Sequence, residues 1–333
     1  MFEDVLAFFD RHQSFILTTH DSPDADGLGA EYVLALILLT RGKNVTIINS
    51  SPVPINLHFL YNPAFEIIRW DISMLASAEH TALLENSAMI ILDTTEEIHL
   101  GPVREDIKKV KEVFYFDHHE PKQSGKLAGK LTGVMDSTAS SVSELAIELA
   151  CYLEIELDPQ TATAAYCGII YDTGFFSYPK TSGRTFKAAI KTLEWGANPH
   201  HVYKQLMENS TCAAVLLQKQ ALANLEFFMG RKIAVMFLHK EDFKKVGAEF
   251  EEVENIVNIP LKAKEVELSI LVREKTTGET FCSLRSKGSV NVSKIAQYFN
   301  GGGHLTASGF MSKDNIETTI KKLLTYIEAR VNL

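Results

Sequence analysis

The chain contains 333 residues, a length that accommodates roughly two domains of about 150 residues each. Its composition is 46% hydrophobic and 23% charged, which is typical of globular proteins and excludes collagen-like, low-complexity and disordered classes. The 33 basic and 42 acidic residues give a net charge of −9, which argues against a protein that coats nucleic acid or an anionic membrane through bulk charge.

The first part of the chain alternates helices with apolar strands. Residues 2–11 predict an amphipathic helix, and residues 27–41 predict a second helix. Short runs rich in Ile, Val and Phe predict four strands, which are FILTT ending at Thr19, NVTIIN ending at Asn49, AMIILD ending at Asp93 and VFYFD ending at Asp117. Continuous apolar strands that alternate with helices are typical of a parallel sheet covered on both faces.

From residue 139 the pattern becomes helical. Helices are predicted over 139–151, 159–171, 182–195, 199–208 and 211–225. Beyond them, residues 232–238, 266–275 and 280–287 predict strands, and residues 291–299 and 315–331 predict helices. We therefore expect an α/β protein with a parallel-sheet domain over residues 1–210, a helical connector over 211–225 and a smaller α/β domain over 226–333.

Sequence features also bear on compartment and membrane association. The four cysteines form no CxxC pair, so neither a disulfide framework nor a zinc finger is expected. The opening residues, MFEDVLAFFD, carry acidic side chains where a signal peptide needs basic ones. The longest apolar run, residues 32–39, is too short to span a bilayer. We expect a cytoplasmic protein without a membrane partner.

Acidic residues and histidines gather where strands end. HDSPDADG, residues 20–27, follows the first strand, Asp93 ends the third, and the Asp-His-His run at 117–119 ends the fourth. Asp172 directly follows a predicted helix. Ligand sites in open parallel sheets lie beyond the carboxyl ends of the strands, so we expect these side chains to converge.

Converging carboxylates repel one another, and cations relieve that repulsion. A mixed Asp and His ligand set suits a divalent ion such as manganese. Two such ions about 3.5–4 Å apart commonly assist phosphoryl transfer to water. Each motif alone has a simpler explanation: a strand-end Asp is usually a helix cap or a turn residue, and a His pair also occurs in cores.

The four motifs, HDSPDADGLGA, ILDTT, DHH and YDTG, resemble the four ordered motifs of the DHH phosphoesterase superfamily. GGGHLTASG, residues 301–309, resembles the signature of the DHH-associated C-terminal domain. The resemblance covers essentially the whole chain. It implies a catalytic DHH domain over residues 1–210 and a substrate-binding domain over residues 226–333.

The resemblance implies two manganese ions, for which Mg²⁺ or Co²⁺ are possible substitutes. One ion would be held by His20 and Asp24, the other by Asp26, His118 and Asp172, and Asp93 would bridge them.

Two further residues would act beside the ions. Asp117 would orient a histidine, and His119 would face the scissile phosphate as a hydrogen-bond donor or general acid. The attacking group would be a metal-bound hydroxide.

The second domain would recognise the substrate. Its candidates are Arg285, Lys287, Gly302, Gly303 and His304. Glycines allow close backbone approach and successive amides bind anions, while Arg and Lys bring positive charge. A flexible turn and a solvated strand edge are the alternatives for these positions.

Within the superfamily the chain most resembles nanoRNases, which hydrolyse short oligoribonucleotides and also adenosine 3′,5′-bisphosphate (pAp). A cyclic-di-AMP or pApA phosphodiesterase is the nearest alternative. An inorganic pyrophosphatase is disfavoured by GGGHLTASG, and a non-catalytic nucleotide sensor by the presence of every candidate ligand. Resemblance also suggests a homodimer.

Overall fold

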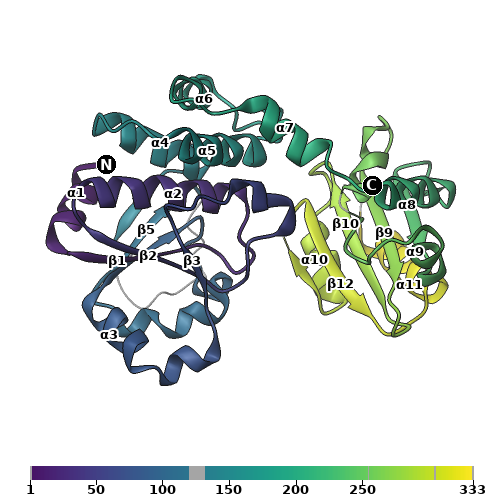
Figure 1. Ribbon diagram of the computed structural model, residues 1–333. Helices are drawn as coiled ribbons and strands as arrows, with labels where there is room; N and C mark the ends of the chain where they lie inside the picture. Colours follow the sequence, from purple (N-terminus) through teal and green to yellow (C-terminus); the bar gives the residue numbers. More distant parts are fainter. Residues whose placement is uncertain (1, 120–131, 254, 304, 332–333) are drawn as a thin grey trace. The chain divides into compact units, whose positions relative to one another are not determined.

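The computed structural model describes residues 2–119, 132–253, 255–303 and 305–331. The chain folds into two compact units, Met1–Asn209 and Ser210–Leu333. Each unit has a six-stranded sheet and a hydrophobic core of its own (Figure 1).

The sheet of the first unit is parallel throughout, with the strand order β3-β2-β1-β4-β5-β6. Its strands are β1 (Ser14–Thr18), β2 (Asn44–Asn49), β3 (Ile67–Arg69), β4 (Ala88–Leu92), β5 (Val113–Asp117) and β6 (Gly133–Met135). Because β1 lies between β2 and β4, the strand order reverses there. A reversal of this kind opens a crevice at the carboxyl ends of the two central strands.

Both faces of this sheet are covered, because alternate strand residues point to opposite sides. Phe15 and Leu17 of β1 pack with α1, α2, α4 and α5, whereas Ile16 packs on the other side near α3. The helices of the unit are α1 (Phe2–Arg11), α2 (Ala25–Thr40), α3 (Ala78–Asn86), α4 (Val142–Tyr152), α5 (Pro159–Asp172), α6 (Gly183–Glu194) and α7 (Pro199–Met207). The predicted parallel sheet with helices on both faces is confirmed.

Helix α2 is buried around almost its whole circumference. It lies between the sheet and the helices α4 and α5 (Figure 1), and its run from Leu28 to Leu38 contains one charged residue, Glu31. A helix that is apolar all round is stable only when it is covered on all sides. This explains why a strongly apolar segment, residues 32–39, belongs to a core helix.

The second unit has a mixed sheet with the strand order β11-β12-β10-β9-β8-β7, in which β8 and β9 are parallel and the other pairs antiparallel. Its strands are β7 (Glu226–Phe228), β8 (Ile233–Leu238), β9 (Leu268–Glu274), β10 (Thr280–Ser286), β11 (Gly302–Gly303) and β12 (Ala307–Ser312).

Four helices cover the two faces of the second sheet: α8 (Cys212–Ala223), α9 (Lys240–Val246), α10 (Val292–Tyr298) and α11 (Ile316–Arg330). The first two pack on one face through Leu217 and Phe243, and the last two pack on the other through Ile295 and Leu323. Helix α8, which begins within the predicted connector, is therefore part of the core of the second unit.

The structure also describes the state of the cysteines and the character of the helices. All four cysteines are free; Cys167 and Cys282 are buried, and Cys151 and Cys212 are exposed. Within the described residues, no helix has both the length and the apolarity needed to cross a membrane.

Candidate metal centre

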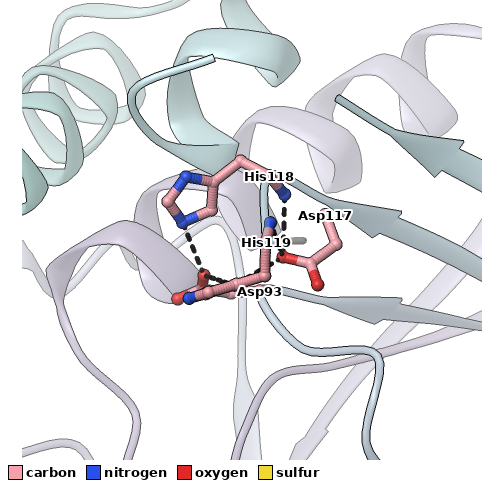
Figure 2. A group of neighbouring side chains, drawn as sticks. All are labelled: Asp93, Asp117, His118 and His119. Atoms are coloured by element: carbon pink, nitrogen blue, oxygen red, sulfur yellow. Dashed lines mark hydrogen bonds and ion pairs between the residues drawn. The ribbon is translucent and has the colours of Figure 1, made fainter. Parts of the chain in front are cut away.

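The candidate residues come together where β1, β4 and β5 end. His20 lies two residues after β1, Asp93 follows β4 directly, and Asp117 is the last residue of β5. Asp172 is the last residue of α5. Figure 2 shows Asp93, Asp117 and both histidines of the Asp-His-His run close together at this edge. The convergence expected from strand-end positions is what the structure has.

The first group consists of His20, Asp24 and Asp93. The Nε2 atom of His20 lies 3.6 Å from Asp24 Oδ2 and 3.5 Å from Asp93 Oδ2. Asp24 is also the N-cap of α2, because its Oδ1 accepts the N–H groups of Asp26 and Gly27 at 2.9 and 3.1 Å. One carboxylate oxygen therefore anchors the helix, and the other stays directed at His20.

The second group consists of Asp26, His118 and Asp172. The Nε2 atom of His118 lies 3.2 Å from Asp172 Oδ2, 3.9 Å from Asp26 Oδ2 and 3.4 Å from Asp93 Oδ1. Asp93 thus faces both groups, with one carboxylate oxygen toward each histidine. A shared carboxylate is the feature that a bridged pair of cations requires.

Asp26 is completely buried and its position is set by helix α4. Its two carboxylate oxygens accept the backbone N–H groups of Val142 and Ser143 at 2.7 and 2.8 Å. These N–H groups belong to the first turn of α4, where the helix dipole and the free amides favour a negative charge. Formation of α4 therefore holds this carboxylate in the cluster.

The residues present fit divalent cations. Asp93 Oδ1 and His118 Nε2 are buried, face each other at 3.4 Å and have no hydrogen-bond partner among the described residues. Buried polar atoms nearly always form a hydrogen bond, so two buried atoms that form none are candidates to bind a further partner. Carboxylate oxygen and imidazole nitrogen are both donors that manganese accepts.

The pKa values show how strongly the cluster favours positive charge. Burial and the neighbouring carboxylates raise the pKa of Asp26 and Asp172 above the ordinary value. Burial opposes protonation of His20 and His118, yet the carboxylates around them raise the pKa to about 10 and about 11. The same histidines lower the pKa of Asp93, although burial alone would raise it. A site of this kind attracts cations.

Asp117 organises the second half of the Asp-His-His run. Its Oδ1 accepts the backbone N–H groups of His118 and His119 at 2.8 and 3.2 Å, and it lies 2.8 Å from Nδ1 of His119 (Figure 2). Asp117 is buried, whereas the side chain of His119 is 49% exposed. With the proton on Nδ1 bonded to Asp117, the Nε2 atom of His119 is free for a substrate. Asp93, Asp117, His118 and His119 form a third possible ligand group, but Asp117 Oδ1 already accepts three bonds.

A buried polar network behind His20 was not anticipated from the sequence. The N–H of Thr19 donates to Asn49 Oδ1 at 3.1 Å, and the amide of Asn49 donates to Glu31 Oε2 at 3.0 Å. The hydroxyl of Thr19 donates to the carbonyl oxygen of Leu92, the residue before Asp93. This network joins the ends of β1, β2 and β4. Asn49 is the last residue of β2, and Asp93 directly follows β4. The position of Asn49 at a strand end was therefore the sequence feature that could have identified it as part of the site.

Gly303, one of the two glycines predicted to bind substrate, has a packing reason. Gly302 and Gly303 form β11, which pairs with Gly309 and Ser308 of β12. Gly303 has a φ of +133°, and a Cβ there would lie 2.6 Å from the carbonyl oxygen of Ala307. The flexible turn considered for this segment is therefore a short strand pair, in which close backbone contact requires glycine. Substrate binding by Gly302 and Gly303 stays a prediction.

Two basic candidates lie on or just after β10. Arg285 donates to the carbonyl oxygen of Leu284 at 3.0 Å. The ammonium of Lys287 donates to the carbonyl oxygens of Ala263 and Lys264 at 2.8 and 3.2 Å, so this side chain already has main-chain partners. His304 lies outside the described residues.

Two sequence families match the chain. Residues 14–169 match the DHH family, N-terminal domain, and residues 230–332 match the DHHA1 domain. The chain belongs to the DHH family. The two matched ranges fall in the first and the second compact unit, respectively.

Curated relatives and one solved structure extend this result. The chain is 27% identical to the bifunctional oligoribonuclease and PAP phosphatase NrnA of Bacillus subtilis over 90% of this chain and 89% of the relative. It is 30% identical to a probable NrnA of Streptococcus mutans over 51% of this chain. It is 24% identical to a membrane protein–ribosomal subunit bL9 fusion protein of Onion yellows phytoplasma over 96% of this chain. It spans 56% and 37% of the length of the last two proteins, respectively.

The fold is shared with an exopolyphosphatase-related protein from Bacteroides fragilis. The TM-score is 0.87 at 24% identity, and the match covers 98% of this chain and 96% of the other. At this identity the match establishes the arrangement of strands and helices.

Proposed function

We propose that this protein is a manganese-dependent phosphoesterase that hydrolyses short oligoribonucleotides and pAp. The observation that carries the proposal is the two groups of His and Asp side chains at the carboxyl ends of the central strands, with Asp93 facing the histidine of each group. The names of the Bacillus subtilis and Streptococcus mutans relatives support this choice of substrates.

His20, Asp24 and Asp93 would hold one cation, and Asp26, His118, Asp172 and Asp93 would hold the other. When bound, the pair of cations supplies positive charge to the phosphate and acidifies water that attacks it. The mixture of imidazole and carboxylate donors favours manganese, with Mg²⁺ or Co²⁺ as weaker or alternative occupants.

In its imidazolium form, with one proton on Nδ1 bonded to Asp117, His119 would donate its second proton from Nε2 to an oxygen of the scissile phosphate. Its exposed ring and its bond from Nδ1 to the buried Asp117 support this role. Asp117 would fix the orientation of the ring and stabilise its imidazolium form, which is how a carboxylate commonly assists a histidine that acts as an acid. Asp117 is therefore a positioning residue and His119 the group that touches the substrate.

The second unit would bind the rest of the substrate. The strand β10 carries Arg285, and β11 presents the backbone of Gly302 and Gly303, which are exposed. Arginine side chains and backbone N–H groups both bind phosphate oxygens. The net charge of −9 agrees with a short substrate, because a long polyanion would need an extended basic surface.

The test is a hydrolysis assay in Mn²⁺ with five substrates at equal concentration: a short RNA of two to five nucleotides, pAp, pApA, cyclic di-AMP and pyrophosphate. We expect the highest kcat/KM for the short RNA or pAp. Fastest hydrolysis of pApA or cyclic di-AMP would contradict the proposed substrate and leave the metal centre standing. Binding of all five without hydrolysis would contradict the proposal of an enzyme.

A further inference from the structure

The segment between Asp172 and helix α6 is held in a tight left-handed turn. Gly174, Phe175 and Phe176 have φ angles of +53°, +57° and +63°. The N–H of Phe175 donates to the carbonyl oxygen of Ile170 at 2.8 Å, which folds the segment back on α5. Left-handed backbone at two phenylalanines is unfavourable and persists only where surrounding contacts impose it.

Aromatic packing and hydrogen bonds supply those contacts. The ring of Phe176 stacks on Phe186 of α6 at 4.9 Å between centroids. The N–H groups of Ser177 and Tyr178 both donate to the carbonyl oxygen of Thr173 at 2.9 Å. The turn is therefore fixed at both ends, and these contacts determine the path of the backbone that follows it.

This backbone path places Lys180 beside the candidate metal centre. Its ammonium donates to the carbonyl oxygen of His118 at 3.3 Å, while Asp172, at the start of the same segment, lies 3.2 Å from the ring of His118. Lys180 is exposed, and its partner in this long hydrogen bond is a neutral carbonyl group. An anionic phosphate oxygen would be a stronger partner for an ammonium group.

The net charge of the cluster explains why a further positive group beside it would help to bind a phosphate. Five carboxylates converge, those of Asp24, Asp26, Asp93, Asp117 and Asp172. Two divalent cations neutralise four of these five charges, and the ligating histidines are neutral when they bind metal. An incoming phosphate group then meets a site without surplus positive charge, so a cation at its edge strengthens binding.

We propose that Lys180 binds a non-bridging oxygen of the substrate phosphate at the metal centre. This role rests on the proposed function, because it assigns one more contact to the same substrate. A lysine suits this role because its ammonium is a point charge on a flexible side chain. The side chain can leave the carbonyl oxygen of His118 and reach a phosphate oxygen.

The experiment compares the wild-type protein with Lys180→Gln and Lys180→Arg. Lys187→Gln is the matched control, because Lys187 is exposed on the adjacent helix α6. Calorimetry measures Mn²⁺ affinity and then the affinity of the manganese-loaded protein for inorganic phosphate. We expect Lys180→Gln to weaken phosphate binding about ten- to a hundredfold, the range for loss of a charge-assisted hydrogen bond. Lys180→Arg should restore most of the affinity, and Lys187→Gln should match the wild type.

Mn²⁺ affinity should be unchanged in all variants. Equal phosphate affinity in Lys180→Gln and the wild type would overturn the assignment, as would a wild-type protein that binds Mn²⁺ but no phosphate. A loss of Mn²⁺ affinity in Lys180→Gln would show that Lys180 stabilises the arrangement of the metal-binding side chains. That result would also overturn the assignment. A wild-type protein that fails to hydrolyse oligonucleotides contradicts the proposed function alone, because the phosphate comparison still reports on Lys180.

Discussion

At the scale of single residues, position 93 requires both a carboxylate group and a left-handed backbone conformation. The carboxylate of Asp93 faces His20 with one oxygen and His118 with the other, and its backbone has a φ of +60°. Aspartate and asparagine adopt this left-handed conformation more readily than other non-glycine residues. A substitution that tests the carboxylate alone should therefore be asparagine, which keeps both the shape and the backbone preference.

We expect Asp93→Asn to fold normally and to lose hydrolysis by about a thousandfold, since several kcal/mol of charge stabilisation depend on the shared carboxylate. Steady-state kinetics in Mn²⁺ and a thermal unfolding curve measure the two quantities. Asp21→Asn is a suitable control, because Asp21 is next to His20 and its Oδ1 accepts from Ser51, a bond that asparagine can keep. Activity of Asp93→Asn within tenfold of the wild type would contradict the shared-ligand role.

At the scale of elements, the first turn of α2 fits closely over the end of β1. A Cβ on Gly27 would collide with the hydroxyl of Thr19, which is completely buried and bonded to the carbonyl oxygen of Leu92. Threonine is branched at Cβ, so its side chain has little freedom to move aside. The glycine therefore sets the distance between the helix that carries Asp26 and the strand end that carries His20.

Gly27→Ala should lower the free energy of unfolding by about 1–3 kcal/mol, the usual effect of overpacking a core. It should also weaken Mn²⁺ binding, because the proposed ligands on the two elements would move apart. Gly183→Ala is the matched control: Gly183 is in the first turn of α6, a Cβ added there would meet no atom within 4 Å, and alanine should stabilise the protein by about 0.5–1 kcal/mol. Urea unfolding of both variants decides, and equal stability of the two would contradict the close fit.

The sequence was a good guide to elements with long, uniform patterns. The strand NVTIIN and the helix over residues 2–11 have the predicted bounds, because apolar runs and amphipathic spacing are local properties. Strand β12 was missed, since Gly309 and serines interrupt its apolar pattern and its pairing with β10 stabilises it instead. Helix α9 was missed because seven residues give too short a pattern.

The candidate site shows the same division. Polar residues at strand ends could be found from the sequence, because a parallel sheet brings such ends together. Glu31 and Lys180 could not, since each reaches its place through a contact with a distant residue, Asn49 in one case and His118 in the other. No local sequence pattern identifies a glutamate that is buried in a core helix, or a lysine that a turn brings next to a distant residue.

At the scale of the whole molecule, the buried Glu31 makes stability depend on pH. Burial raises its pKa from 4.5 to about 8, more than its bond from Asn49 lowers it. Between these two values the folded protein holds a proton that the unfolded chain has released. The free energy of unfolding therefore falls as pH rises through this range, by about 1.4 kcal/mol per pH unit for this group.

Glu31→Gln removes the titration and keeps the shape. We expect the metal-free variant to lose this contribution, so that its stability falls less steeply than that of the wild type between about pH 5 and pH 8. Urea unfolding at several pH values gives both slopes. Parallel slopes for the two proteins would show that Glu31 does not titrate in this range.

The order in which the proposed ligands occur along the chain has a kinetic consequence. His20 and Asp172 stand at the two ends of a stretch that includes the strands β2 to β6, and α4 must also form before Asp26 is held. Contacts between such distant residues form late in folding, because long loops must close first. Bound cations would therefore slow unfolding far more than they speed folding. A growing chain on the ribosome has all the proposed ligands only after α5 has emerged, so bound cations would stabilise the first unit late in its synthesis.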